Sequence, residues 1–456
     1  MQFNSMIKNK KMGFIMIAIF RILFYLCLTP YTLSGDSSEY INVSTFSIIC
    51  GNLHMRRTPV YPLFLDIVRV IFSDCRGQIY LYIVVLIQII VSYISVLFFY
   101  DILNKVLKKS KISYIVTFLY GISPSVIGWD KIILTESLAL SGTVFFIWLL
   151  IKYLEKPSFV YGVWINILIA ALVFLRPTFL VNYCIVVVFW SIRYFMYSNE
   201  KRILIKNLIG AFGVGLFVIG YCAKFNEQYG IFTLSATKAQ QDCITIVQHS
   251  LWNDVKNLNE TDVNILKTIL ENNSLDDERG CIKAAGEVLG SFDLKEIAVF
   301  NNKVKKTREY FKHKCWTFFL LADIDLSNNV WYGTNIYTSN VLYNEDQIPL
   351  YSVHNSMTMR KVVNIWRRLN PTIRFIHIYL ICVIELVIIV KNLLKRKDTW
   401  VHLGIAGFLL SISLTSIWGT CGEWGRTAIC VLPYAYLAIA IYMQFLIEKI
   451  VKNYNS

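Results

Sequence analysis

The chain has 456 residues, of which 55% are hydrophobic and 15% aromatic, and its formal net charge is +15. So much apolar sequence excludes a water-soluble enzyme of this length and predicts a polytopic membrane protein. The positive charge does not indicate a nucleic-acid partner, because the 17 basic and 17 acidic residues between Lys224 and Arg368 cancel. The excess lies mostly in short loops between apolar runs, where the positive-inside rule places basic residues.

Ten apolar runs predict an all-α protein with about ten transmembrane helices, since a helix needs about 20 apolar residues to cross a bilayer. They lie at residues 12–29, 79–100, 112–129, 132–151, 159–175, 178–194, 207–223, 374–391, 400–417 and 427–447. With the basic loops in the cytoplasm, ten spans place both termini there. The chain is then expected to divide into a membrane module at 1–223 with its first outer loop at 30–78, a mostly helical soluble domain on the outer side at 224–373, and C-terminal membrane helices at 374–456.

The first outer loop carries acidic residues and then a basic pair. Asp36 and Glu39 follow the first predicted helix, and Arg56 and Arg57 come about twenty residues later. A carboxylate can take the proton of an attacking hydroxyl, and guanidinium groups bind phosphate through charge-assisted hydrogen bonds. Each residue also has a plainer interpretation: Asp36 as a helix N-cap, Glu39 as its capping-box partner, and the arginines as snorkelling side chains at the membrane surface.

A second outer turn, between the predicted third and fourth helices, contains Asp130, Lys131 and Glu136. A carboxylate beside an apolar helix is costly unless it faces a polar cavity. Asp130 or Glu136 could bind an acceptor, orient Asp36, or help to hold a divalent ion, and Lys131 is a candidate phosphate ligand. The alternative is simple solvation of a helix start with an ion pair to Lys131.

Several of these motifs resemble those of the polyprenyl-phosphate-sugar-dependent glycosyltransferases of the GT-C superfamily. This superfamily includes the protein O-mannosyltransferases and the bacterial lipid A aminoarabinose and Rgt-type sugar transferases. The matching motifs are Gly-Asp-Ser-x-x-Tyr from Gly35, Arg-x-Pro-x-Tyr-Pro from Arg57, Thr-Glu-x-Leu around Glu136, Leu-Arg-Pro at Arg176, and Gly-Arg followed by a proline seven residues later at Arg426.

The resemblance implies a GT-C fold and an integral membrane enzyme that moves a sugar, with inversion, from a polyprenyl monophosphate carrier to a glycan, lipid or protein acceptor. In this interpretation Asp36 is the base, Glu136 and Asp130 support it, and the donor phosphate is held by Arg56, Arg57, Arg176, Arg426 and Lys131. No cofactor is required, although paired acids would permit a divalent cation. The sequence is rich in Lys, Ile and Asn, which is typical of bacteria with AT-rich genomes. This usage favours a bacterial cell membrane with the site facing the periplasm or exterior.

Two other functions compete with this one. An O-antigen polymerase or ligase would carry its decisive arginines in the large outer loop, whereas here the motifs lie early. A transporter or flippase of lipid-linked sugars predicts inverted repeats and broken helices in matching halves, and the sequence has neither.

A few residues have no role in this interpretation. The eleven cysteines lack metal-ligand spacing, although Cys50 and Cys75 could form a disulfide across the first loop. Arg21 lies inside the first span, so it should face protein or a cavity and could pair with a carboxylate on a neighbouring helix. His54 is interpreted as an ordinary loop histidine.

Overall fold

The computed structural model describes residues 10–26, 31–33, 36–72, 79–107, 110–271, 278–317, 378–395, 398–420 and 424–454. Within these ranges every regular element is a helix, and the one β contact is an isolated parallel bridge between Thr32 and Ile132. The predicted all-α class is therefore confirmed for the described residues. Cys75 lies outside them, and so does the predicted pairing with Cys50.

Among the described residues six helices are long and apolar enough to cross a membrane, which agrees with the prediction of an integral membrane protein. They are α6 (Ile79–Leu107), α9 (Glu136–Glu155) and α21 (Trp400–Gly419), together with three helices that are each preceded by a short 3-10 turn. The last three spans are Pro177–Met196 with α11 (Leu180–Met196), Ser198–Tyr229 with α12 (Lys201–Tyr229), and Ile429–Asn453 with α23 (Leu432–Tyr454). Shorter helices occupy the other predicted runs: α2 (Lys10–Leu26), α7 (Ser110–Gly121), α10 (Phe159–Leu175) and α20 (Ile378–Leu394). A count of ten spans stays a prediction.

The predicted helices at 112–129 and 132–151 are wrong at their shared boundary, because residues 122–135 do not continue either long helix. α7 ends at Gly121 because Ser123 precedes a proline and is extended, with φ −64° and ψ 123°, and a residue before proline is disfavoured in the helical region. The short α8 (Pro124–Ile127) and a series of turns follow until α9 begins. Thr32 N–H donates to Lys131 O at 2.8 Å, and Ile133 N–H donates to Thr32 O at 3.0 Å. This turn is thus bonded to the segment that leads to Asp36.

Arg21 shows why this turn can be buried in an apolar bundle. Its Nε donates to Gly121 O at 2.7 Å, its Nη1 donates to Ser92 Oγ at 3.0 Å, and Nη1 lies 3.8 Å from Asp130 Oδ2. A charge inside a membrane segment needs such partners. The expected pairing of Arg21 with a carboxylate is therefore observed.

Between α2 and α6 the chain forms three short helices, α3 (Ser37–Asn42), α4 (Thr45–Ile49) and α5 (Val60–Ile71). α5 buries Tyr61, Leu65 and Val68 and exposes Val70 and Ile71 on its other side. An amphipathic helix with an exposed apolar face suits the surface of a bilayer.

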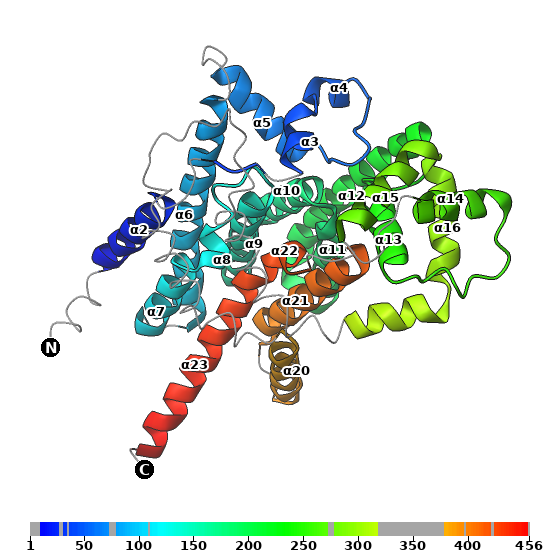
Figure 1. Ribbon diagram of the computed structural model, residues 1–456. Coiled ribbons are helices and arrows are strands. Elements are labelled where there is room, and N and C mark those ends of the chain that lie inside the picture. The colour runs from blue at the N-terminus through cyan, green and yellow to red at the C-terminus, as the bar shows by residue number, and fades with distance from the viewer. Residues whose placement is uncertain are drawn as a thin grey trace.

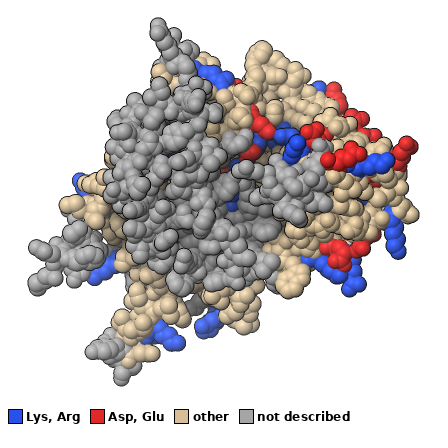
Figure 2. Space-filling model, viewed as in Figure 1, with Lys and Arg blue, Asp and Glu red and all other residues tan. Residues whose placement is uncertain are grey.

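After α12 the helices α13 (Thr237–Gln248), α14 (Glu260–Glu271), α15 (Glu278–Ser291) and α16 (Leu294–Lys305) pack together beside the membrane helices (Figure 1). This α13–α16 unit has a core of its own, which includes Ile246, Ile265, Val288 and Phe300. A further helix covers 308–317, and residues 318–377, which include the rest of the predicted outer domain, lie outside the described part. In Figure 2 most of the visible acidic side chains lie over the right half of the face, and those furthest right lie over the α13–α16 unit.

Candidate active site

A cleft of about 500 Å³ lies where the first loop, the start of α9, the end of α10, the link from α12 to α13 and the end of α21 meet. Six of the eight candidate residues line it although they come from distant parts of the chain: Asp36, Arg56, Arg57, Glu136, Arg176 and Arg426. The motifs that the sequence placed on one side of the membrane therefore converge in space.

Asp36 lies between two guanidinium groups. Its Oδ1 accepts from Arg57 Nη2 and its Oδ2 accepts from Arg426 Nη2, each at 2.7 Å. Asp36 stands at the N-cap position of α3, but its side chain makes no capping hydrogen bond, so the N-cap interpretation of this carboxylate is wrong. Burial alone would raise the pKa of Asp36, but the positive charges of Arg426 and Arg57 outweigh it and lower the pKa to about 2.

Arg426 joins Asp36 to a second, deeper carboxylate. Its Nε donates to Glu136 Oε1 at 2.6 Å, and Glu136 is only 1% exposed because it opens α9 at the floor of the cleft. Arg176 Nη1 lies 3.8 Å from the same oxygen. That nitrogen is buried and has no hydrogen-bond partner among the described residues. Because a buried unpaired donor is costly, it is a position where an anionic ligand would gain most.

Glu39 binds the arginine pair at the other end of the cleft. Its Oε1 accepts from Arg56 Nη1 and its Oε2 from Arg57 Nε, each at 2.8 Å. Arg57 also lies over the ring of Tyr40, 4.6 Å from its centroid. The predicted capping-box role of Glu39 is not observed, since its carboxylate is engaged by guanidinium groups.

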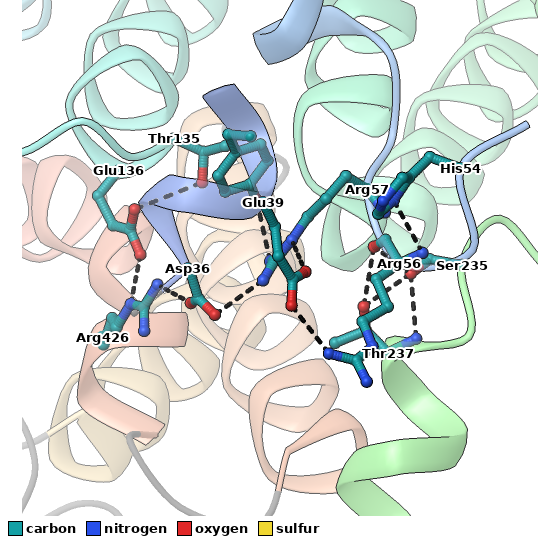
Figure 3. Close-up of polar contacts among 11 residues, drawn as sticks. Asp36, Glu39, His54, Arg56, Arg57, Thr135, Glu136, Ser235, Thr237 and Arg426 are labelled. Atoms are coloured by element: carbon teal, nitrogen blue, oxygen red, sulfur yellow. Dashed lines mark hydrogen bonds and ion pairs between the residues drawn. The ribbon is translucent and has the colours of Figure 1, made fainter. Parts of the chain in front are cut away.

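The seven side chains form a row in which basic and acidic groups alternate, most of which is drawn in Figure 3. In order along the cleft they are Arg176, Glu136, Arg426, Asp36, Arg57, Glu39 and Arg56. Four arginines against three carboxylates leave one positive charge. The carboxylates offset the repulsion between neighbouring arginines. An anionic ligand can therefore bind by taking the place of a carboxylate as the partner of an arginine.

The opposite wall of the cleft comes from the link between α12 and α13 and was missed by the sequence analysis. Ser235 Oγ and Thr237 Oγ1 both donate to Arg56 O, at 2.6 and 2.9 Å, and Ala236 N–H donates to Met55 O at 2.8 Å. No local motif marks these residues, because their role depends on partners about 180 positions away.

Two lysines join the helices after α12 to the end of α21. Lys238 Nζ donates to Trp418 O at 3.0 Å, and Lys314 Nζ donates to Ile417 O and Thr420 O at 2.9 and 3.0 Å. In these contacts, as in those that residues 235–237 make with Met55 and Arg56, the acceptors are main-chain carbonyl groups.

Asp130 and Lys131 do not line the cleft. Asp130 is fully buried, where it accepts from Tyr25 Oη at 2.5 Å and Ser137 Oγ at 2.6 Å, and Lys131 Nζ donates to Tyr25 O at 2.6 Å. The sequence grouped these residues with Glu136, but the turn before α9 carries them to a different part of the bundle.

The carboxylates of the cleft are paired with arginines and are not grouped with one another. No group of three or more His, Cys, Asp or Glu side chains among them is placed to hold a metal ion. The cleft carboxylates Asp36 and Glu136 are each bonded to Arg426. In this arrangement the site is suited to an anionic ligand.

Comparison with known proteins gives only distant structural likenesses. No family model and no curated protein matches the sequence. The chain is similar to the oligosaccharyltransferase of Archaeoglobus fulgidus in its apo form, with 13% identity, a TM-score of 0.47, and coverage of 98% of this chain and 52% of that chain. It is also similar to the oligosaccharyltransferase AglB of the same organism in complex with an inhibitory peptide and a dolichol-phosphate, with 13% identity, a TM-score of 0.45, and coverage of 97% and 52%. The chain spans about half the length of these structures. A likeness of this size leaves the chemistry to be argued from the side chains of the cleft.

Proposed function

We propose that this chain is a membrane glycosyltransferase of GT-C architecture that moves a sugar from a polyprenyl monophosphate carrier to a hydroxyl-bearing acceptor. The observation that carries the proposal is the position of Asp36, a partly exposed carboxylate between two arginines in a cleft. A base and a phosphate site are the two elements that such a transfer needs, and here they are in direct contact.

The transfer follows from these groups. The acceptor oxygen bonds to the anomeric carbon of the sugar and its proton goes to the Asp36 carboxylate. The bond from that carbon to the phosphate oxygen breaks, and its electron pair leaves with the carrier phosphate, which gains one negative charge. Arg57, Arg426 and Arg176 would stabilise that charge, because fixed guanidinium donors favour an anion as it develops.

Donor binding would also prepare the base. In the structure Asp36 is a weak base because its two arginine partners lower its pKa to about 2. A phosphate that shares Arg57 and Arg426 takes part of their positive charge away from Asp36, which raises the carboxylate's proton affinity. The base would therefore become effective only when a donor is present, and an empty site would not act on bound hydroxyl groups.

The direction of the cleft agrees with an active site on the outer face. α9 begins at the cleft and α10, α12 and α21 end there, whereas the opposite ends of these helices and of α6 carry lysines such as Lys105, Lys152 and Lys201. The positive-inside rule places those lysines in the cytoplasm. We propose a bacterial cell membrane as the setting on the basis of the Lys-, Ile- and Asn-rich residue usage alone.

The test is transfer of labelled sugar by the purified protein from a panel of synthetic polyprenyl monophosphate donors, with and without EDTA. Transfer by the wild type that is lost in Asp36→Asn would support the assignment, and the active donor would identify the sugar. Movement of the intact carrier across liposomes without bond cleavage would contradict it and favour a flippase.

A further inference from the structure

His54 lies two residues before Arg56, and its ring folds back over the backbone of the arginine pair. Its Nδ1 accepts hydrogen bonds from the backbone N–H groups of Arg56, at 3.2 Å, and Arg57, at 3.0 Å (Figure 3). An Asn side chain accepts in the same way from the N–H two residues on, in an Asx turn. The His54 ring thus closes the turn that presents both guanidinium groups to the cleft.

The same turn is fixed from its other side. Met55 O and Arg56 O accept hydrogen bonds from residues 235–237 of the link between α12 and α13. Those contacts satisfy carbonyl groups, whereas His54 satisfies N–H groups. The imidazole is therefore the acceptor on which the inner side of the turn depends.

This acceptor exists only while the ring is neutral and carries its proton on Nε2. Protonation of Nδ1 would turn the acceptor into a donor that faces two other donors. Burial lowers the pKa of His54 from its usual 6.5, the charge of Glu39 opposes this shift, and Arg57 and Arg56 add to it. The ring is accordingly neutral at pH 7 and titrates on the acid side of 6.5.

The neighbouring helix α12 adds other groups at this stretch. Tyr229 Oη donates to Leu53 O at 2.7 Å, and Gln228 Oε1 accepts from Leu53 N–H at 2.9 Å. Lys224 Cε lies 3.5 Å from the position that a Cβ would take at Gly51. The charged groups that act on the His54 ring are Glu39, which favours a proton, and Arg57 and Arg56, which oppose one.

We propose that His54 is a positioning residue that holds the Arg56–Arg57 turn in its anion-binding conformation, and that acidification releases this turn. The first half of the proposal concerns the loop alone, and the second half rests on the proposed function, because it concerns binding of a phosphate-bearing lipid.

Three substitutions separate this role from simple packing. In His54→Asn the Oδ1 atom takes the place of Nδ1 and does not titrate. In His54→Gln the oxygen lies one bond further out, and His54→Ala has no acceptor. His249→Asn, which removes an exposed histidine of the α13–α16 unit, is the matched control.

The first experiment measures amide hydrogen exchange at pH 7 on the peptide that contains Arg56 and Arg57. We expect wild-type protection in His54→Asn and in the control, and about tenfold faster exchange in His54→Gln and His54→Ala, which corresponds to about 1.4 kcal/mol, or one net hydrogen bond. Equal protection in all four variants would overturn the positioning role.

The second experiment measures binding of a short-chain polyprenyl monophosphate between pH 7.5 and 5. The ratio of the Kd of the wild type to that of His54→Asn cancels the titration of the ligand itself. We expect this ratio to be near one at pH 7.5 and to rise by up to about tenfold below pH 6.5, since the wild-type turn opens and the Asn turn does not. A ratio that stays constant would overturn the acid release.

The two experiments test separate claims, so one claim can be contradicted while the other stands. If no variant binds the lipid phosphate at any pH, the proposed function fails, while the exchange rates still decide whether His54 holds the turn. If the lipid binds but the exchange rates do not depend on residue 54, the proposed function stands and His54 has no positioning role.

Discussion

Asp36 and Arg426 are 390 positions apart in the sequence, and Arg426 Nη2 donates to Asp36 Oδ2 at 2.7 Å. Through this contact the last part of the chain completes a site that begins in its first loop. Arg426 also donates to Glu136, so one guanidinium connects three segments.

Asp36→Asn should reduce sugar transfer by about 10²–10⁴-fold, which is the usual contribution of a general base. Donor binding should be retained, because Arg57 and Arg426 lose a competing carboxylate. The measurement is initial rate and donor Kd on purified protein, with Glu227→Gln, an exposed acid 69% accessible on α12, as control. Full activity of Asp36→Asn would remove Asp36 from the mechanism.

Arg426→Met should destabilise the protein by about 3 kcal/mol, because it leaves the buried charge of Glu136 without its bonded partner. The double variant Arg426→Met/Glu136→Gln should recover most of this loss, since the uncompensated charge is gone. Thermal unfolding in detergent gives the comparison. Transfer should stay absent in both variants, because the phosphate loses a ligand. Additive effects of the two substitutions on stability would contradict the pairing.

Asp36 should also make the empty protein sensitive to acid. Its pKa of about 2 in the folded state lies below the value of about 3.9 expected when unfolded. The ion pairs therefore stabilise the protein above pH 4, and this contribution is lost as the pH falls from about 4 to 2. Because Asp36 is 36% exposed, solvent screens the effect and keeps it small. Unfolding temperatures at stepped pH should fall less steeply for Asp36→Asn than for the wild type.

Asp130→Asn should affect stability and spare the chemistry. Asp130 accepts from Tyr25 and Ser137 in a buried cluster outside the cleft, and an amide presents one acceptor where the carboxylate presents two. We expect a lower unfolding temperature and transfer per folded molecule within about threefold of wild type. The check is active-site-normalised turnover after size exclusion. A hundredfold loss of turnover at unchanged stability would return Asp130 to the catalytic set.

The site motifs could be predicted because each is local. A charged residue within two positions of a proline or glycine is visible in a window of a few residues, and Asp36, Arg57, Arg176 and Arg426 all have this pattern. The partners of these groups could not be predicted. Glu39 was interpreted as a capping residue because sequence shows its neighbours along the chain and not the guanidinium groups of a folded loop.

The helix positions follow from hydropathy, whereas the break between α7 and α9 does not. Residues 122–135 contain Ile127, Trp129 and Ile133, all buried, so the segment is apolar enough to be taken for membrane-spanning sequence. Its apolar side chains are buried against protein, and Ser123-Pro124 ends the helix first. Hydropathy does not distinguish a segment that is buried against protein from one that crosses the membrane. Placing Asp130 and Lys131 at the outer turn beside Glu136 followed from this single ambiguity.

The α13–α16 unit and the segments that flank it make hydrogen bonds to main-chain carbonyl groups of the rest of the protein. The acceptors at Met55, Arg56, Ile417, Trp418 and Thr420 are all carbonyl oxygens. A carbonyl is present whatever side chain the residue carries, so these contacts do not constrain the identity of the accepting residues. The donors Ser235, Thr237 and Lys238 also line the cleft and are constrained, because they donate through their side chains. Substitution on the accepting side can therefore alter the shape and polarity of that part of the rim while the two parts of the protein continue to assemble in the same way.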